Sequence, residues 1–490
     1  MQCKSWRTRQ AEGPGGENGM THLMALTAGE VESIHRATLR ILDGTGILLT
    51  QPEAQELFSG EGARIRGDRV ELPPDVVERT LARCPHQATV RGRGGQTVTL
   101  GDGNLHWHNL GGAAQVYEPG SRVCRPATLQ DVRDATRLLD ALPSVTTITP
   151  FFTPQEASGP LMSLAMYRNA LAHTVKPLQG PGTQTAAEVR YTARMASVIG
   201  PPAEVLSLGI SPISPLILPD DVAEAIIETA RLGITLAPLP CPTAGATAPM
   251  SMAGALAQQN AEVLASIVLA QAVRPGLPVV YCGRLAMMEP RTGVSVWGGV
   301  ELGLVSAGTV ALAHFYGLPA NVYGLSTNSH TLDLQNGHER ALNAILPALA
   351  GADELSGIGE MAAGVAGSFA QMVCDDEIAS TIGRLVRGFA VDDDALAVEL
   401  IDRVSRDSHN YLDQKHTVRY LRAGELLSTH LAERRSFQEW ERGGAQLMAD
   451  RAQAEADRLL AEHQVPPLTG DQERELDEIM AEAARELGPA

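Results

Sequence analysis

The chain is 490 residues long, carries a formal charge of −18, and 44% of its residues are hydrophobic. This length suits one large barrel with added elements, or two to three ordinary domains. Because phosphate groups are bound by basic surfaces, the acidic charge argues against nucleic acid and anionic membranes as partners.

The cysteines indicate a reducing environment. There are six of them, and they form no C-x-x-C pair: Cys3, Cys84, Cys124, Cys241, Cys282 and Cys374. We interpret them as reduced thiols of a cytoplasmic protein.

The first part of the chain is predicted to be a disordered extension followed by an α-rich segment. Residues 1–22 are polar and rich in glycine, without the apolar core of a secretory signal, and Met20 or Met24 is a plausible natural start. In residues 23–103 the capping box Thr27 to Glu30 predicts a helix up to Leu42. Two more helices are expected at 51–58 and 73–83, and short β-like runs at 88–100.

Residues 104–390 alternate between short apolar runs and segments that can form helices. We expect eight strands, near 105–110, 145–149, 175–179, 205–210, 235–239, 278–282, 320–324 and 355–358. Eight strands, most of them followed by a helix, predict an α/β fold of the (β/α)8 TIM-barrel type. A doubly wound open sheet with insertions is the alternative. A hairpin is expected at 116–124, and Thr128 with Asp131 predicts the start of a helix that runs to Leu142.

Residues 302–329 contain no charged side chain other than a histidine. A membrane span and a buried helix leading into a buried strand both fit, and His314, Pro319 and Asn321 favour the buried helix.

Residues 391–490 are predicted to be a helical C-terminal extension packed on the barrel. Charged amphipathic helices are expected at 395–405, 438–460 and 472–487, with residues 465–467 as a linker.

The familiar catalytic motifs are missing from the sequence. It has no Walker loop, no H-E-x-x-H and no nucleophile elbow, and Gly111-Gly112 lacks the other Rossmann glycines. His106 and His108 would share one face of a strand, but no third ligand lies near them in the sequence. We therefore predict no metal site.

The chemistry of a parallel barrel is carried by the loops at the carboxyl ends of its strands. Five of the few aromatic residues fall in or near these ends: Trp107, Phe151, Phe152, Trp297 and Tyr323. They form either part of the core or a cage for a cation. Trp297 lies in the glycine-rich loop 292–299, which could close over a ligand.

Charged residues near the same ends are further candidates. Glu360 directly follows the last strand and is predicted to face the cavity, Glu301 is undecided, and Asp333 is expected to start a helix. Arg284 and Lys176 could meet a substrate carboxylate. For Lys176 a salt bridge within the scaffold is the alternative.

Several motifs resemble the trimethylamine methyltransferase (MttB) superfamily, and they occur in the family's order from about residue 27 to 465. They are Gly111–Ala113, Arg125–Thr128 with Asp131, Lys176–Leu178, Ser211–Leu216, Gly245–Pro249, Ala253–Leu256, Asn260–Leu264, Leu332–Gln335, Gly351-Ala352, Asp375–Glu377, Arg435 and Trp440. The resemblance implies a barrel that presents a methylated amine to the cob(I)alamin of a separate corrinoid protein. This chain would bind no cofactor tightly.

One departure from the family narrows the expected substrate. Members that act on trimethylamine carry pyrrolysine in a loop that corresponds to about residues 325–328, where this chain has ordinary residues. Members without pyrrolysine include demethylases of glycine betaine and related quaternary amines. The resemblance therefore implies a member of the glycine betaine methyltransferase type.

The resemblance also suggests roles for the candidate residues. Trp107, Phe151, Phe152, Trp297 and Tyr323 would form the cage, with Glu360 as counter-charge. His108, Arg284, Ser326 and His330 would hold the polar end of the substrate, and we rank Glu360 and His330 as catalytic. We further expect a homo-oligomer. A different barrel enzyme, such as a lyase or a folate-type methyltransferase, and a non-catalytic protein that binds a quaternary amine are the alternatives.

Overall fold

The computed structural model describes residues 25–157, 159–180 and 182–488, so the expected N-terminal extension lies outside the described residues. Helix α1 (Ala28–Gly44) starts at Thr27, whose side chain and that of Glu30 form the predicted capping box. Helices α2 (Pro52–Glu61) and α3 (Pro74–Leu81) follow, and α1, α2 and α3 all contact α9 (Met252–Val273). A small sheet joins them, in the order β1 (Ile47–Leu48), β3 (Arg69–Glu71), β2 (Arg64–Arg66).

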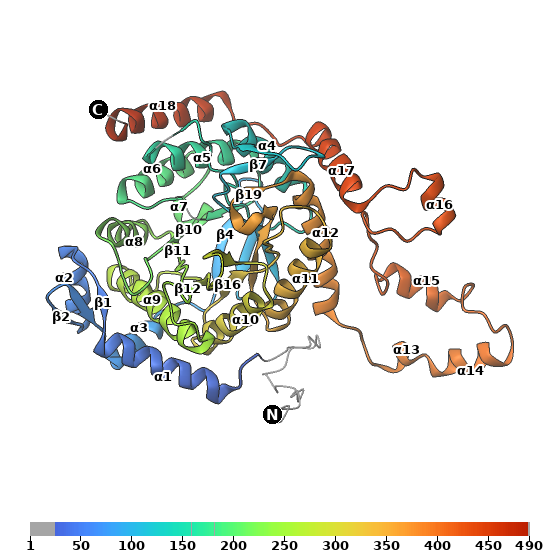
Figure 1. Ribbon diagram of the computed structural model, residues 1–490, viewed down its shortest axis with the longest axis horizontal. Helices are drawn as coiled ribbons and strands as arrows, with labels where there is room; N and C mark the ends of the chain where they lie inside the picture. The colour runs from blue at the N-terminus through green and yellow to red at the C-terminus, as the bar shows by residue number, and fades with distance from the viewer. Residues whose placement is uncertain (1–24, 158, 181, 489–490) are drawn as a thin grey trace.

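Two parallel sheets form the centre of the molecule (Figure 1). One has the order β11 (Thr235–Pro238), β10 (Leu206–Ile210), β9 (Leu178–Gly180). The other has the order β13 (Tyr281–Gly283), β16 (Ala320–Tyr323), β17 (Glu354–Ile358), β6 (His106–Asn109).

Backbone hydrogen bonds connect these sheets on both sides. The Val280 amide donates to Leu236 at 2.9 Å, which links β11 to the segment before β13. On the other side, residues 146–149 lie between β6 and β9: Thr146 donates to Trp107, and Gln179 donates to Ile148, both at 2.9 Å. The eight parallel segments therefore make a continuous circuit, and the TIM-barrel prediction is confirmed.

A ring of helices surrounds this circuit, and each helix follows its own strand in the sequence. Neighbouring helices contact each other all the way round, in the order α4 (Leu129–Ala141), α5 (Pro160–His173), α6 (Ala186–Ser197), α8 (Asp220–Leu232), α9, α10 (Val300–Phe315), α11 (Leu334–Leu349) and α12 (Phe369–Arg387). The short α7 (Pro202–Val205) precedes β10. Most residues of α10 after Glu301 are buried, and α10 leads into the largely buried β16, so the buried-helix interpretation of residues 302–329 is confirmed. No helix among the described residues is long and apolar enough to span a membrane.

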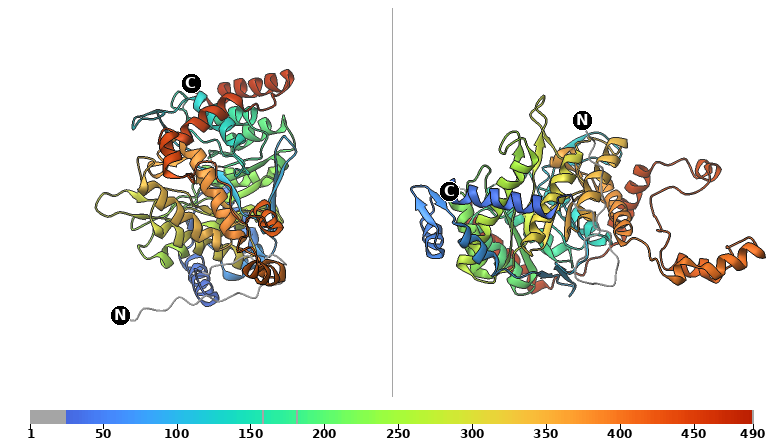
Figure 2. Two further views of the ribbon diagram at one scale, coloured as in Figure 1. Left: turned by 90° about the vertical axis from the view of Figure 1, so that its right-hand side faces the viewer. Right: turned by 90° about the horizontal axis from the view of Figure 1, so that it is seen from below.

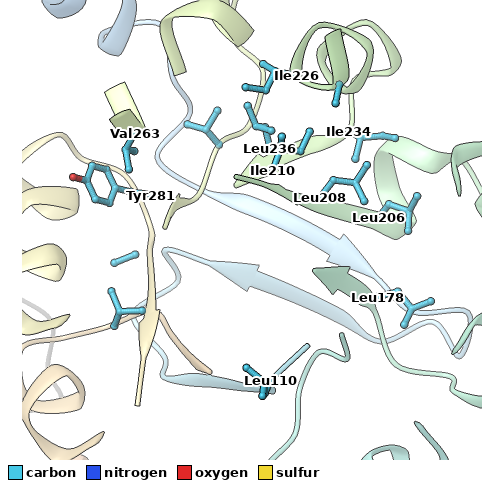
Figure 3. Packing of buried hydrophobic residues seen from close by; sticks show 14 of the residues in the cluster. Leu110, Leu178, Leu206, Leu208, Ile210, Ile226, Ile234, Leu236, Val263 and Tyr281 are labelled. Atoms are coloured by element: carbon cyan, nitrogen blue, oxygen red, sulfur yellow. The ribbon is translucent and has the colours of Figure 1, made fainter. Parts of the chain in front are cut away.

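The strands present apolar side chains outward and many polar ones inward. Leu206, Leu208 and Ile210 of β10 alternate along the strand and lie in the layer between strands and helices, near Ile226 of α8 (Figure 3). On the inner side Glu354 accepts hydrogen bonds from the side chains of Thr147 at 2.6 Å, Gln179 at 2.7 Å and Asn321 at 2.5 Å.

The amino-terminal end of the barrel is covered by the hairpin of β4 (Ala88–Arg91) and β5 (Thr97–Leu100). Its buried Val90 and Leu100 pack against Ala237, Val280 and Cys282 of the barrel strands. A ligand is therefore expected to enter at the opposite, carboxyl-terminal end, which we call the mouth.

Short strands build up the mouth. A sheet has the order β18 (Glu360–Met361), β19 (Ala366–Gly367), β7 (Gln115–Tyr117), β8 (Cys124–Pro126), and β7 with β8 is the predicted hairpin. The 3-10 turn η1 (Ala362–Gly364) joins β18 to β19. A second sheet has the order β12 (Thr243–Ala244), β14 (Ala286–Met288), β15 (Ser295–Val296).

The C-terminal extension follows the prediction only in part. Helix α17 (Met448–Glu462) packs on α12 and α4, and α18 (Gly470–Leu487) packs on α5 and α6. The helix expected at 395–405 is broken at Ala397, where φ is +49°, into α13 (Asp393–Leu396) and α14 (Val398–Arg406). The helix expected at 438–460 is divided at Gly443-Gly444 into α16 (Phe437–Arg442) and α17. Helices α13, α14, α15 (Lys415–Arg422) and α16 stand away from the barrel, contrary to the prediction (Figures 1 and 2).

Candidate functional site

Glu360 is a buried carboxylate at the mouth, as the sequence predicted. Its Oε1 accepts a hydrogen bond from the Ser326 hydroxyl at 2.5 Å, whereas its buried Oε2 has no hydrogen-bond partner among the described residues. Burial raises the pKa of Glu360 to about 7, although the Ser326 hydroxyl and the nearby Arg340 favour the charged form. A buried, half-satisfied carboxylate is costly for the fold, which is typical of a functional group.

An ion pair behind Glu360 holds it in place. The fully buried Arg340 of α11 pairs with Asp375 of α12 at 2.9 Å and donates to the backbone oxygens of Leu325 and Glu360. Asp375 in turn accepts from the Gly359 amide at 2.7 Å. Both strand ends, after β16 and after β17, are therefore fastened to one guanidinium, which fixes the distance between them.

The loop after β16 also positions the loop that carries Trp297. The Asn328 side-chain oxygen accepts from the amides of Trp297 at 2.8 Å and Gly298 at 2.7 Å. The Glu339 carboxylate accepts from the Thr327 hydroxyl at 2.6 Å and from the Asn328 amide at 3.0 Å. The Trp297 loop is thus held at the mouth by hydrogen bonds that its backbone amides donate to Asn328, which Glu339 in turn holds in place.

Tyr323 lies between the other predicted groups of the mouth. Its ring centroid is 5.1 Å from that of Trp297 and 4.8 Å from the guanidinium carbon of Arg284. Burial raises the pKa of Tyr323 well above its usual value, the charge of Glu360 raises it further, and Arg284 opposes the rise. An acidic and a basic group therefore both lie within electrostatic range of one phenol ring.

Arg284 is a buried cation that reaches the buried carboxylate of Glu354 only through the Asn321 side chain, which donates to Glu354 at 2.5 Å. It is 4% exposed and donates to the Asn321 backbone oxygen at 3.0 Å and to the Asn321 side chain. Within the described residues no carboxylate forms a salt bridge with it, and a buried charge is normally paired. His108 also contacts Asn321, at 3.1 Å, and burial lowers the pKa of His108, which favours its neutral imidazole.

The remaining predicted aromatic residues lie elsewhere. Phe151 and Phe152 are fully buried with ring centroids 4.5 Å apart, and a Cβ at Gly359 or Gly367 would collide with the Phe151 ring. Trp107 is in the main hydrophobic core, on the strand face opposite to His108. The structure does not bring these three rings together with Trp297 and Tyr323, because strand alternation and close packing turn them into the scaffold.

Four other charged or titratable candidates form no hydrogen bond or ion pair with Glu360, Arg284, Trp297 or Tyr323. His330 is exposed, whereas its neighbour Ser329 is buried. Asp333 is the N-cap of α11, as predicted, and Glu301 lies in the first turn of α10. The Lys176 ammonium donates to the backbone oxygens of Leu139 and Leu142 at 2.9 and 2.7 Å, at the end of α4, so it serves the scaffold.

The two histidines of β6 have different partners and do not share a site. His106 contacts Asp102 at 3.3 Å, while His108 joins the interior network. The residues that the structure describes contain no group of three metal-ligating side chains.

Sequence reasoning missed the residues that support the site: Asn321, Asn328, Arg340, Asn343 and Glu354. A signal was available for some of them. Asn336, Arg340 and Asn343 recur at helical spacing on one buried face of α11, which is unusual for a helix that packs on a barrel. Asn343 accepts from the Ser326 amide at 3.3 Å and donates to the Ser326 oxygen at 2.7 Å.

Comparison with known proteins identifies the family of the chain. The sequence model described as trimethylamine methyltransferase (MTTB) matches residues 3–488. The chain is 31% identical over 472 residues to the trimethylamine methyltransferase MttB of Desulfitobacterium hafniense, covering 94% of each protein. It is 30% identical over 473 residues to a glycine betaine methyltransferase of the same species, covering 94% of this chain and 98% of that one. Among solved structures, the monomethylamine methyltransferase of Methanosarcina barkeri aligns with 89% of this chain and 93% of that chain, at 13% identity and a TM-score of 0.48. The chain belongs to the trimethylamine methyltransferase family and is a methyltransferase.

Proposed function

We propose that this protein transfers a methyl group from a quaternary methylated amine that bears a carboxylate, such as glycine betaine, to the cob(I)alamin of a separate corrinoid protein. The observation that carries the proposal is the pair of buried, opposite charges at the mouth, Glu360 and Arg284, neither of which forms a direct salt bridge among the described residues. Glu360 has an oxygen without a partner, and Arg284 has no carboxylate partner among the described residues. A zwitterionic substrate would supply an ammonium for Glu360 and a carboxylate for Arg284.

The cationic end of the substrate belongs beside Glu360, Trp297 and Tyr323. A quaternary ammonium cannot donate a hydrogen bond, so its recognition depends on charge and on aromatic faces. The free Oε2 of Glu360 supplies the charge, and its lack of a hydrogen-bond donor costs least when a cation lies against it. Of the five predicted cage rings, Trp297 and Tyr323 are the two that remain for this role.

The carboxylate end belongs beside Arg284. One face of the Tyr323 ring is already covered by this guanidinium, which leaves less of the ring for the ammonium. Three of the guanidinium's hydrogen bonds go to backbone and side-chain oxygens of Gly283 and Asn321. Its remaining N–H groups suit the fork of a carboxylate.

The proposed methyl transfer requires little acid–base catalysis from this chain. A quaternary ammonium departs as a neutral amine, so no general acid is needed and no pyrrolysine is required. The corrinoid, carried by the partner, supplies the cobalt nucleophile that accepts the methyl group. The task of the mouth is to remove water from the cation and to aim one methyl group outward.

A methyl-transfer assay tests the proposal. The purified chain is mixed with a cognate corrinoid protein in the cob(I)alamin state, and methylation is followed by absorbance with glycine betaine, carnitine, proline betaine and choline. We expect transfer from at least one carboxylate-bearing amine and much weaker transfer from choline, which has no carboxylate. If none of the four amines methylates the corrinoid, the proposal is wrong.

A matched pair of variants tests the role of Arg284. Arg284→Gln should remove most of the preference for glycine betaine over choline, because the carboxylate loses its partner. Arg291→Gln changes an exposed arginine near the same mouth and should leave the preference unchanged. A calorimetric measurement distinguishes the non-catalytic alternative, since binding of glycine betaine without methyl transfer would support a binding protein.

A further inference from the structure

The interior of the barrel is unusually polar just below the mouth. In barrels of this kind, bulky branched side chains usually fill the interior. Here Cys282, Asn321 and Glu354 are paired residues of the neighbouring strands β13, β16 and β17, and all three are buried. Thr147 and Gln179 join this group by donating to Glu354. When all of its hydrogen bonds are satisfied, such a buried network fixes the positions of its members.

Asn321 uses the full hydrogen-bonding capacity of its side chain. Its Nδ2 donates to Glu354 at 2.5 Å and to His108 at 3.1 Å. Its Oδ1 accepts from Arg284 and from the Cys282 thiol, which lies at 3.6 Å. An Asn amide can donate two hydrogen bonds and accept two, whereas a guanidinium can only donate. The oxygen must therefore face Arg284 and the nitrogen must face Glu354, so the amide is held in one orientation.

Asn321 occupies one particular edge of the Arg284 guanidinium. Nη1 donates to the Asn321 backbone oxygen at 3.0 Å, and Nη2 donates to the Asn321 side-chain oxygen. Nη1 also donates to the Gly283 oxygen at 3.2 Å. Among the described residues, no group accepts a hydrogen bond from Nε. The end of the guanidinium is thus bound by Asn321, and its side, formed by Nε and Nη2, is left for a ligand.

The Tyr323 ring restricts the same guanidinium from a second direction. The guanidinium carbon of Arg284 lies over this ring, 4.8 Å from its centroid. With its end on Asn321 and one face on Tyr323, the guanidinium can neither turn in its plane nor tilt freely. The free Nε–Nη2 edge is therefore preorganised to donate two parallel hydrogen bonds to a carboxylate.

We infer that Asn321 is a specificity-determining positioning residue, which turns the Nε–Nη2 edge of Arg284 toward the carboxylate of the substrate. This role rests on the proposed function, since it requires a substrate that bears a carboxylate. Glu354 acts one step further back, because it holds the Asn321 nitrogen and so keeps the Asn321 oxygen on the guanidinium. The preference for a carboxylate-bearing amine is then set by the three buried residues together.

Calorimetry of glycine betaine and choline with full-length variants tests this role. Asn321→Ala should raise the Kd of glycine betaine about tenfold, because the guanidinium is no longer held in the orientation that suits a carboxylate. The Kd of choline should hardly change, since choline has no carboxylate. The matched control is Asn260→Ala on α9. Asn260 is equally buried and hydrogen-bonds with Tyr281 at 2.7 Å and Thr38 at 3.0 Å, so its loss should lower stability and leave both Kd values unchanged.

A double-mutant cycle shows whether Asn321 acts through Arg284. In the Arg284→Gln protein, Asn321→Ala should have little further effect on the Kd of glycine betaine, because the group that it positions is already gone. An equal effect in both backgrounds would overturn the inference, and so would an Asn321→Ala protein that binds both ligands more weakly by the same factor. Both outcomes leave the proposed function intact. If Arg284→Gln itself keeps the preference for glycine betaine over choline, the proposed role of the carboxylate fails and the inference fails with it.

A milder variant keeps the inference testable if Asn321→Ala does not fold. Asn321→Ser leaves a polar group in the interior, but its hydroxyl is too short to hold Arg284 in place of the amide oxygen. We expect the circular dichroism of the original protein and the same selective rise in the Kd of glycine betaine. A folded Asn321→Ser protein that binds glycine betaine as tightly as the original would overturn the inference.

Discussion

The pair Phe151–Phe152 and the pair Trp297–Tyr323 use the same kind of side chain for different purposes. The two phenylalanines are fully buried and touch the backbone at Gly359 and Gly367. The other pair is half-buried and has Arg284 on one ring and Glu360 within electrostatic range. Both pairs lie near the carboxyl ends of strands, so an aromatic residue's position along the chain does not decide its role. The groups that surround each ring do.

The phenylalanine pair supports the site from behind. A Cβ at Gly359, where φ is +88°, would lie 2.7 Å from the Phe151 ring, so only a glycine lets the strand end approach this closely. Glu360 is the next residue. The core pair therefore helps to set the position of the carboxylate, while the other pair is the one that we propose touches the ligand.

The largest expected effect is on folding. Phe151→Ala should lower the free energy of unfolding by about 3 to 5 kcal/mol, because it opens a cavity in a closely packed region. Denaturant titration followed by fluorescence measures this change. Val123→Ala, at an exposed position, should stay within about 0.5 kcal/mol of the original protein. A Phe151→Ala protein of unchanged stability that no longer binds quaternary amines would place Phe151 in the ligand site and remove the distinction between the pairs.

The next effect is on catalysis. Glu360→Gln should lower kcat/KM for the quaternary amine about 10- to 100-fold, which is the usual 1.5 to 3 kcal/mol of a buried charged contact. Its unfolding free energy should not fall, because the amide removes the cost of burying a charge. Glu301→Gln is the matched control at the mouth and should change kcat/KM less than twofold. An unchanged kcat/KM in Glu360→Gln would show that this carboxylate does not face the substrate.

The raised pKa of Glu360, about 7, predicts how binding depends on pH. A quaternary ammonium binds the ionised carboxylate, and at pH 6 most of the free protein carries the protonated form. The dissociation constant should therefore be about tenfold larger at pH 6 than at pH 8 and should level off above about pH 8. Calorimetry across this range measures it. In Glu360→Gln the dependence should disappear, and a pH dependence that survives in this variant would have to come from another group.

Local patterns in the sequence predicted more of the fold than of the site. The capping boxes at Thr27 and Thr128 involve residues three apart, so the sequence was enough to place the starts of α1 and α4. The strand count was correct because the apolar runs are short and regularly spaced. The break at Ala397 was missed, since an alanine with positive φ leaves no trace in composition.

The site depends on contacts between residues far apart in the chain. Ser326 and Glu360 were both predicted at the mouth, and they form a hydrogen bond, but their catalytic and binding roles stay predictions. The ion pair between Arg340 and Asp375 could not be predicted from the sequence, because the two residues lie on different helices and no local pattern relates them. For Lys176 the sequence left a substrate carboxylate and a role in the scaffold open, and the structure shows its ammonium donating to backbone oxygens at the end of α4.

The smallest expected effect separates the Trp297–Tyr323 pair from the Phe151–Phe152 pair most directly. Trp297→Leu should weaken binding of the quaternary amine about 2- to 5-fold, since one partly exposed aromatic face contributes about 0.5 to 1 kcal/mol to a cation. Its stability should change little, because the ring is only half-buried and the loop is held by hydrogen bonds that its backbone amides donate to the Asn328 side chain. Calorimetry with glycine betaine measures the binding, and Trp297→Phe should restore most of it. A Trp297→Leu protein that loses stability but keeps its affinity would mean that Trp297 packs as Phe151 does, and the cation would then have to be held by Glu360 and Tyr323 alone.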